Sequence, residues 1–193
     1  MQKNYNISFI TFNYDRSLEF FLHSFPKNRT TKNSRFVFEA MECFPIVHVY
    51  GSLANLPWKD TNAIEYDCHV DPGQLKRMAE NIDIKTSDND SSQLKRAQGL
   101  ISDSNYIYFI GFGYDETNLN RLKIRDCMKE KTIKGTAVGI KQSRRSEILN
   151  FFGLGLRDIY EGPSGPCIVL ADEKTDIIEF LNSHVFPNES FTP

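Results

Sequence analysis

The chain has 193 residues, of which 40% are hydrophobic and 25% are charged, and its formal net charge is −2. This length and composition are typical of a single globular domain and require no second one. The small net charge excludes a surface that attracts nucleic acid or anionic lipid as a whole, so we expect neither as a partner.

The first half of the chain is expected to alternate strands with helices. Leu18, Phe21, Leu22 and Phe25 have the spacing of one helix face, directly after an apolar run that predicts a buried strand. The predicted elements are a strand over 6–12, a helix over 14–25 that ends at Pro26, a short strand at 36–38, a strand over 46–50, a helix from 71 or 72 to 81, and a helix over 91–102.

The second half continues the alternation. The predicted elements are a strand over 106–110, a helix from about 116 to 131, a strand over 136–140, a helix over 143–152, a strand over 168–170 and a helix over 173–182. Strands and helices that alternate in this way form βαβ units. We therefore predict a Rossmann-like α/β fold with a mostly parallel central sheet and helices on both faces. It is expected to form a single domain over residues 1–193, with 161–193 as a variable C-terminal extension.

The cysteines and the N-terminal residues carry no sequence signal for a metal site or a membrane segment. Cys43, Cys68, Cys127 and Cys167 lie far apart without a Cys-x-x-Cys pair, so neither a zinc site nor a disulfide framework is expected. The longest apolar stretches have the length of a strand, and residues 1–6 do not resemble a signal peptide. We expect a cytoplasmic protein without membrane contact and without a bound metal.

Three predicted strands end in polar or glycine-containing segments. These segments are residues 11–15, the Gly51-Ser52 pair and residues 111–115. In parallel sheets, ligands bind beyond the carboxyl ends of the strands, where helix N-termini present N–H groups to anionic or sugar-like groups. Three such ends on one edge of a sheet predict a ligand site.

The same segments carry a resemblance to a known family. Residues 11–15, Thr-Phe-Asn-Tyr-Asp, resemble the Thr-x-Asn-hydrophobic-Asp motif of sirtuin-like NAD-consuming proteins, and residues 50–52, Tyr-Gly-Ser, fall where that family has His-Gly-Ser. Residues 109–119, which contain Gly111 and Gly113, resemble a glycine-containing strand end of the family's bacterial branch. The order and separation of the three motifs agree with the family over residues 7–140.

The resemblance implies an NAD site and, for the bacterial branch that lacks zinc cysteines, hydrolysis of NAD to nicotinamide and ADP-ribose in phage defence. In that reaction Asn13 would position water and ribose, and Tyr50 or His48 would contact the ribose hydroxyls. The cofactor-binding residues that the resemblance implies are Thr11, Asn13, Asp15, Gly51, Gly111, Gly113 and Asn118.

Two departures from the family pattern support other interpretations. The glycine-rich strand end that holds the diphosphate in the family would lie upstream of Asn13, where only residues 1–6 precede the strand. We expect that this first βα unit is absent or is supplied by a partner chain or a second copy in a homo-oligomer. Tyr50 stands in place of the general-base histidine, and tyrosine is mainly a hydrogen-bond donor at neutral pH. A catalytically inactive module that binds a nucleotide or a protein is therefore the alternative function, and NAD-dependent protein deacylation is a third.

Several of these residues also have a purely structural interpretation. Asn13 or Asn118 could cap the helix that follows it, and Asp15 could interact with a helix dipole. His48 lies on the same side of its strand as Tyr50, so it could serve as a displaced base, or it could be a buried histidine that a neighbour satisfies.

Overall fold

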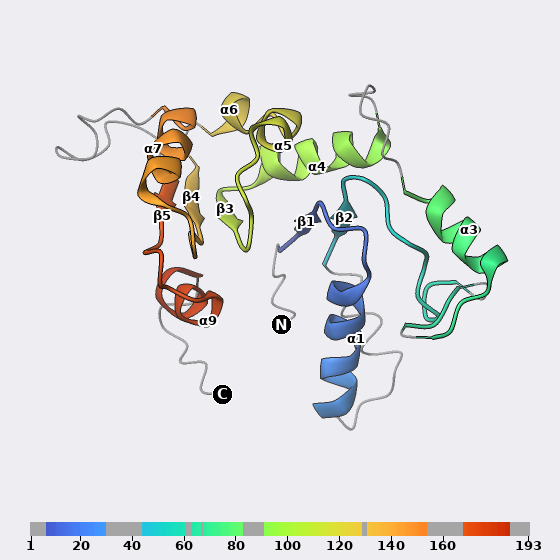
Figure 1. The fold of residues 1–193 in the computed structure, drawn as a ribbon. Helices are drawn as coiled ribbons and strands as arrows, with labels where there is room; N and C mark the ends of the chain where they lie inside the picture. The colour runs from blue at the N-terminus through green and yellow to red at the C-terminus, as the bar shows by residue number, and fades with distance from the viewer. Residues whose placement is uncertain are drawn as a thin grey trace. The chain divides into compact units, whose positions relative to one another are not determined.

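The computed structural model describes residues 7–29, 44–60, 63–66, 68–82, 91–128, 131–153 and 168–185. The chain divides into two compact units, Met1–Ala97 and Gln98–Pro193 (Figure 1). Each unit contains parallel strands and helices, so the predicted α/β class is confirmed.

The first unit is built around a pair of parallel strands. β1 (Phe9–Thr11) leads into α1 (Ser17–Arg29), and β2 (Ile46–His48) pairs with β1 in parallel. An irregular segment then leads to α3 (Pro72–Glu80), and α4 (Ser92–Asp103) begins in this unit. Asp71 caps α3 because its carboxylate accepts from the amide of Gln74 while the Gln74 side chain accepts from the Asp71 amide.

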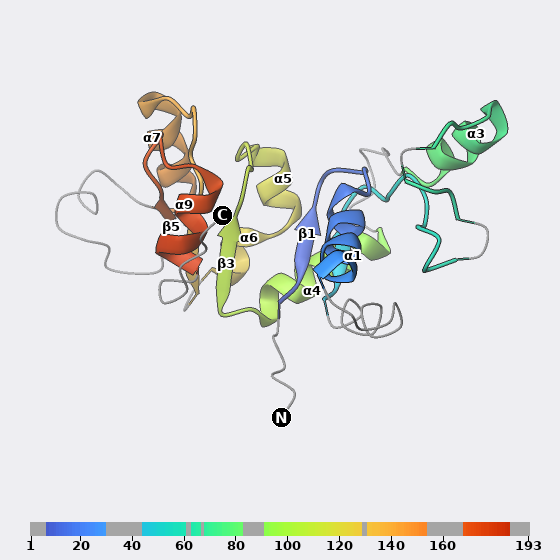
Figure 2. The ribbon, with the colours of Figure 1, turned by 90° about the horizontal axis from the view of Figure 1, so that it is seen from below.

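The second unit contains a three-stranded parallel sheet in the order β3-β4-β5. β3 (Tyr106–Phe109) is followed by α5 (Glu116–Arg121) and α6 (Ile124–Cys127), and β4 (Thr132–Gly135) by α7 (Gln142–Phe151). β5 (Ile168–Leu170) leads into α9 (Ile177–Phe180) and a π-helical turn, Leu181–Val185. α7 lies next to β5 (Figures 1 and 2), because Arg145 of α7 donates to the carbonyl oxygens of Leu170 and Ala171 at 3.3 and 2.8 Å.

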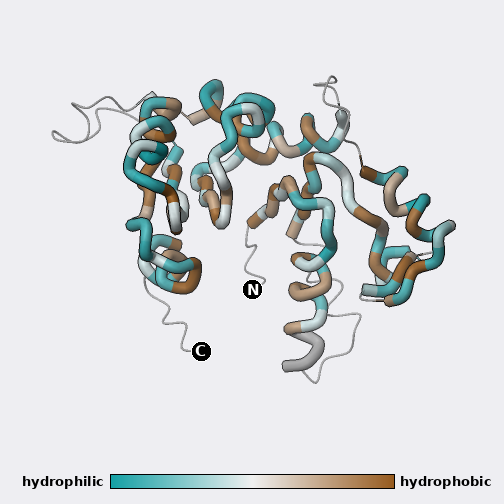
Figure 3. Tube along the Cα trace, viewed as in Figure 1, coloured by the Kyte–Doolittle hydropathy of each residue, from teal (hydrophilic) through white to brown (hydrophobic). Residues whose placement is uncertain are grey.

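Each unit has its own buried apolar residues. Hydrophobic and hydrophilic residues alternate along the helices in Figure 3, as expected where one helix face is buried. In the first unit the buried residues include Val47, Val49, Leu56 and Ile64. In the second unit they include Phe109, Leu119, Ile124, Ile133, Phe152 and Phe180.

Tyr114, which follows β3, is buried against the end of β4. Its backbone is left-handed, with a φ of 53°, and its side chain is only 1% exposed. Burial raises its pKa, so the hydroxyl stays protonated and donates to the carbonyl oxygen of Thr136 at 2.9 Å. The ring lies against Gly135, where a Cβ would overlap the Tyr114 hydroxyl. Gly135 therefore has to lack a side chain for Tyr114 to reach its partner.

Three elements of the second unit differ from the prediction. The strand expected over 136–140 is wrong, because β4 lies four residues earlier and Thr136 and Ala137 follow it as buried residues. The long helix expected over 116–131 is interrupted at Lys123, whose φ of 53° ends one helix and begins the next. Helix α9 also begins later than expected, after its Asp176 cap.

In the first unit, the expected helix end at Pro26 is wrong, since α1 continues to Arg29. A proline costs a helix one hydrogen bond and a steric contact with the preceding turn, but it does not always end the helix. The strand expected at 36–38 lies outside the described residues, as do Cys43, Cys167 and, within the predicted extension over 161–193, residues 161–167 and 186–193.

Candidate functional site

The carboxyl ends of β1 and β2 lie side by side. Thr11 pairs with His48 in the parallel register, and the amide of Val49 donates to the Thr11 carbonyl oxygen at 2.9 Å. Beyond the strands, the amide of Leu53 donates to the carbonyl oxygen of Tyr14 at 2.9 Å. The structure therefore brings together two of the segments that the sequence singles out, residues 11–15 and 50–52.

His48 ties both segments to helix α1. Its Nδ1 lies 2.7 Å from the main-chain oxygen of Asn13, and its Nε2 lies 2.7 Å from Oε1 of Glu19. A carbonyl oxygen can only accept, so Nδ1 carries a proton and donates it. The His48 and Glu19 side chains are 8% and 7% exposed, which makes this a buried pair.

Electrostatics favour the ionised form of this pair. Burial alone would lower the pKa of His48, but hydrogen bonds to Glu19 and to the Asn13 carbonyl raise it. Burial alone would raise the pKa of Glu19, but the hydrogen bond and charge of His48, with a smaller effect of Lys59, lower it. An imidazolium facing a carboxylate results. In this arrangement neither ring nitrogen has a lone pair to offer a substrate, so general-base catalysis by His48 would require the pair to open.

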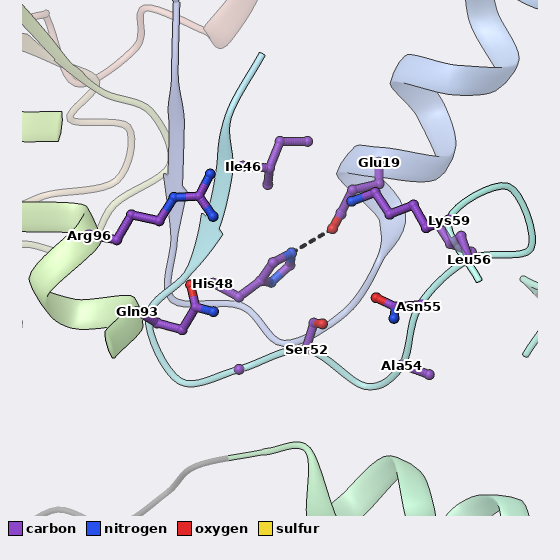
Figure 4. A pocket seen from close by; sticks show the side chains of 11 residues that line it. Glu19, Ile46, His48, Ser52, Ala54, Asn55, Leu56, Lys59, Gln93 and Arg96 are labelled. Atoms are coloured by element: carbon purple, nitrogen blue, oxygen red, sulfur yellow. Dashed lines mark hydrogen bonds and ion pairs between the residues drawn. The ribbon is translucent and has the colours of Figure 1, made fainter. Parts of the chain in front are cut away.

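A cavity of about 240 Å³ lies beside the pair (Figure 4). A neighbouring hollow of about 360 Å³ shares five lining residues with this cavity, which are Gly51, Ser52, Ala54, Asn55 and Gln93. The residues that line the cavity are Glu19, Ile46, His48, Gly51, Ser52, Ala54, Asn55, Leu56, Lys59, Gln93 and Arg96. All of them belong to the first unit, and most are polar or charged.

A buried arginine organises the irregular wall of this cavity. Arg16 is 6% exposed and donates to the main-chain oxygens of Asn55, Ile64 and Glu65, at 3.2, 2.5 and 3.2 Å. Buried carbonyl groups need donors, and a guanidinium supplies several in one plane. Arg16, directly before α1, therefore fixes the backbone that carries Asn55 and Lys59 into the cavity wall.

The motif residues after β1 have definite structural partners. Oγ1 of Thr11 accepts from the amide of Asn13 at 3.0 Å, and Oδ1 of Asp15 accepts from the amide of Ser17 at 2.9 Å. Hydrogen bonds from Ser17 lower the pKa of Asp15. Asp15, rather than Asn13, thus satisfies the first amide of α1, while Asn13 is exposed.

Of the residues that follow β2, Gly51 lines the cavity and Tyr50 does not. Gly51 lines the cavity with a φ of 79°, a left-handed backbone that favours glycine, and its amide donates to the His48 carbonyl oxygen at 3.1 Å. The ring of Tyr50 packs edge-on against Phe12, with the ring centres 5.5 Å apart. Tyr50 is not among the residues that line either hollow.

The remaining predicted ligand residues belong to the second unit. Gly111, with a φ of 61°, donates from its amide to Oγ1 of Thr136 at 2.9 Å. Gly111 and Gly113 border an apolar groove of about 590 Å³ that also includes Val138, Ile177 and Ile178. Asp115 is the cap of α5, because its carboxylate accepts from the Asn118 amide at 3.0 Å. The capping role considered for Asn118 thus belongs to Asp115.

Sequence reasoning missed Glu19, Lys59 and Arg96 as cavity residues. Glu19 lies in the first turn of α1, four positions after Asp15, and this closeness to the motif of residues 11–15 was the available signal. Lys59 comes from an irregular segment and Arg96 from a helix distant in sequence, so no local pattern points to either.

Comparisons of this chain with models of known protein families, with curated proteins and with solved structures find no match. Among the described residues there is no group of three or more histidine, cysteine or acidic side chains that could hold a metal ion. Within that same part of the chain, none of the helices is both long and apolar enough to cross a membrane.

Proposed function

We propose that the first unit binds NAD or a related nucleotide at the carboxyl ends of β1 and β2, in a cytoplasmic protein. The observation that carries this proposal is the polar cavity beside β2 and the turn that follows it, in a unit built on two parallel strands, since α/β sheets hold nucleotides near the carboxyl ends of their strands. The cavity and the adjoining hollow together reach the size range of small-molecule sites. The resemblance to the sirtuin-like family in residues 11–15 and 50–52 names NAD as the first ligand to test.

Hydrolysis of NAD, and the role in phage defence that depends on it, is a second candidate. Two observations favour binding without turnover over hydrolysis. Both nitrogens of His48 are engaged in hydrogen bonds, and Tyr50 packs against Phe12 at the position of the family's general base. A partner chain or a second copy of this chain would complete the site in the hydrolytic version of the proposal.

Calorimetry of the purified full chain with NAD, ADP-ribose and adenosine tests the binding proposal. We expect NAD and ADP-ribose to bind and adenosine to bind more weakly, because the charged lining of the cavity interacts with the phosphates. A chain that binds none of the three would contradict the proposal. Nicotinamide release, followed by chromatography, reports turnover in the same samples.

The Tyr50→His variant tests the hydrolytic candidate. If the pocket lacks only a base, this change should produce nicotinamide release with a pH dependence near 6.5, the ordinary histidine pKa. Tyr50→Phe is the matched control, since it keeps the ring beside Phe12 and adds no base. A Tyr50→His variant that binds NAD but releases no nicotinamide would leave binding without turnover as the function.

A further inference from the structure

We infer that the cavity beside the His48–Glu19 pair holds the diphosphate of its ligand between the side chains of Arg96 and Lys59. This inference rests on the proposed nucleotide binding and names the part of the nucleotide that this cavity recognises. It assigns the diphosphate to side-chain cations from α4 and from the irregular segment after β2, rather than to a glycine-rich turn.

The two cations approach the cavity from opposite sides. In Figure 4, Arg96 lies on the α4 side of His48 and Lys59 extends from the other side toward Glu19. A diphosphate carries negative charge on the oxygens of both of its phosphate groups, so one group can meet each cation. Orthophosphate offers a single group to the two cations. The geometry therefore predicts a preference for pyrophosphate over orthophosphate.

The charge of the lining also favours an anion. Glu19 is the acidic residue among the lining residues, and the His48 imidazolium neutralises it through a 2.7 Å contact. Arg96 and Lys59 then leave an excess of positive charge in the cavity. The charge of His48 contributes to the lowered pKa of Asp15, but Asp15 does not line the cavity. In a partly enclosed site, such a charge excess acts more strongly than on an open surface.

Polar groups that suit phosphate oxygens complete the lining. Ser52 and Gln93 lie beside His48 in Figure 4, and each can donate a hydrogen bond. Gln93 is in the first turn of α4, where the helix dipole adds to the attraction for an anion. The side chains, rather than that helix end, define the site.

Calorimetric titration of the full chain with pyrophosphate and with orthophosphate tests the inference. We expect pyrophosphate to bind at least tenfold more tightly than orthophosphate. Arg96→Ala and Lys59→Ala should each weaken pyrophosphate binding at least tenfold and NAD binding in parallel. Arg77→Ala is the matched control, because Arg77 is an exposed cation of α3 that does not line the cavity.

Circular dichroism and urea denaturation of each variant show whether it is folded, and Arg96→Gln and Lys59→Gln replace any alanine variant that is not. An equal loss of pyrophosphate affinity in the Arg77→Ala variant would mean that the chain attracts anions non-specifically, and it would overturn the inference. NAD binding that persists undiminished in the Arg96 and Lys59 variants would overturn it while leaving the proposed function intact. Pyrophosphate binding that needs both cations, in a chain that does not bind NAD, would support the diphosphate site and contradict the nucleotide proposal.

Discussion

Glu19 and His48 face each other across 2.7 Å with less than one tenth of either side chain exposed. The raised pKa of His48 means that its contribution to stability is complete below the unfolded-state pKa of about 6.5 and is lost as pH rises through the folded value. The lowered pKa of Glu19 means that its contribution is complete above about pH 4.3 and is lost as pH falls through the folded value. The pair therefore stabilises the first unit most between these limits.

The pH dependence of unfolding follows from this pair. We predict that the free energy of unfolding falls as pH rises above 6.5, and that His48→Gln removes this part of the slope, because glutamine does not titrate. Urea denaturation between pH 5.5 and 9 measures both slopes. An unchanged slope in the variant would show that other groups cause the pH dependence.

A double-mutant cycle measures the coupling of the two side chains. His48→Gln alone should cost about 3 kcal/mol, because it leaves a buried carboxylate without its counter-ion. The double variant Glu19→Gln/His48→Gln should cost less than the sum of the single variants. The exposed pair of Lys76 and Glu80, whose charged atoms are 4.0 Å apart, is the control and should show almost no coupling. Additive effects at Glu19 and His48 would contradict the ion pair.

Substitution of Gly135 tests the packing of the second unit. Gly135→Ala should destabilise the chain by about 2 kcal/mol or more, because the new Cβ pushes Tyr114 away from Thr136. Gly99→Ala is the same change in the exposed interior of α4, where a Cβ meets nothing within 4 Å. That control should gain up to about 1 kcal/mol from helix propensity. Similar effects of the two substitutions would contradict the close packing of Tyr114.

The Asn13→Ala variant tests whether this residue serves ligand binding rather than stability. Its main-chain oxygen and amide make the structural contacts of this turn, and these remain in Asn13→Ala. We predict a change in unfolding free energy within about 0.5 kcal/mol, as at other exposed positions, together with a loss of NAD affinity of at least tenfold. Denaturation and calorimetry of one sample give both values. A stable variant with normal affinity would remove Asn13 from the proposed site.

The sequence predicted the elements whose signals are local. The apolar run before Asn13, the Asp71-Pro72 start of α3 and the strand at 168–170 all appear close to their expected positions. The prediction was wrong at 136–140. The Thr-Ala-Val sequence there is typical of a strand, but the residues that pair with β3 lie earlier, at 132–135. Pairing between strands is decided by tertiary contacts, and apolar residues just beyond a strand carry the same local signal.

The candidate site was predictable only in part, for a similar reason. The convergence of residues 11–15 with 50–52 follows from parallel pairing of two strands, and this general rule can be applied to a sequence. The contact of His48 with Glu19 depends on how α1 rotates over the sheet, and the approach of Arg96 depends on where α4 begins relative to β2. Neither the rotation of α1 nor the position of α4 leaves a pattern in the local sequence.

Arg16 has a consequence for how freely this protein can change its sequence. The guanidinium recognises the main-chain oxygens of Asn55, Ile64 and Glu65, which every amino acid possesses. The exposed side chains in the irregular segment can therefore be exchanged while its path stays the same, provided that Arg16 and the buried Leu56 and Ile64 are retained. The segment can thus supply new side chains to the cavity wall, and a change of ligand preference can arise there without a change in the strands that support it.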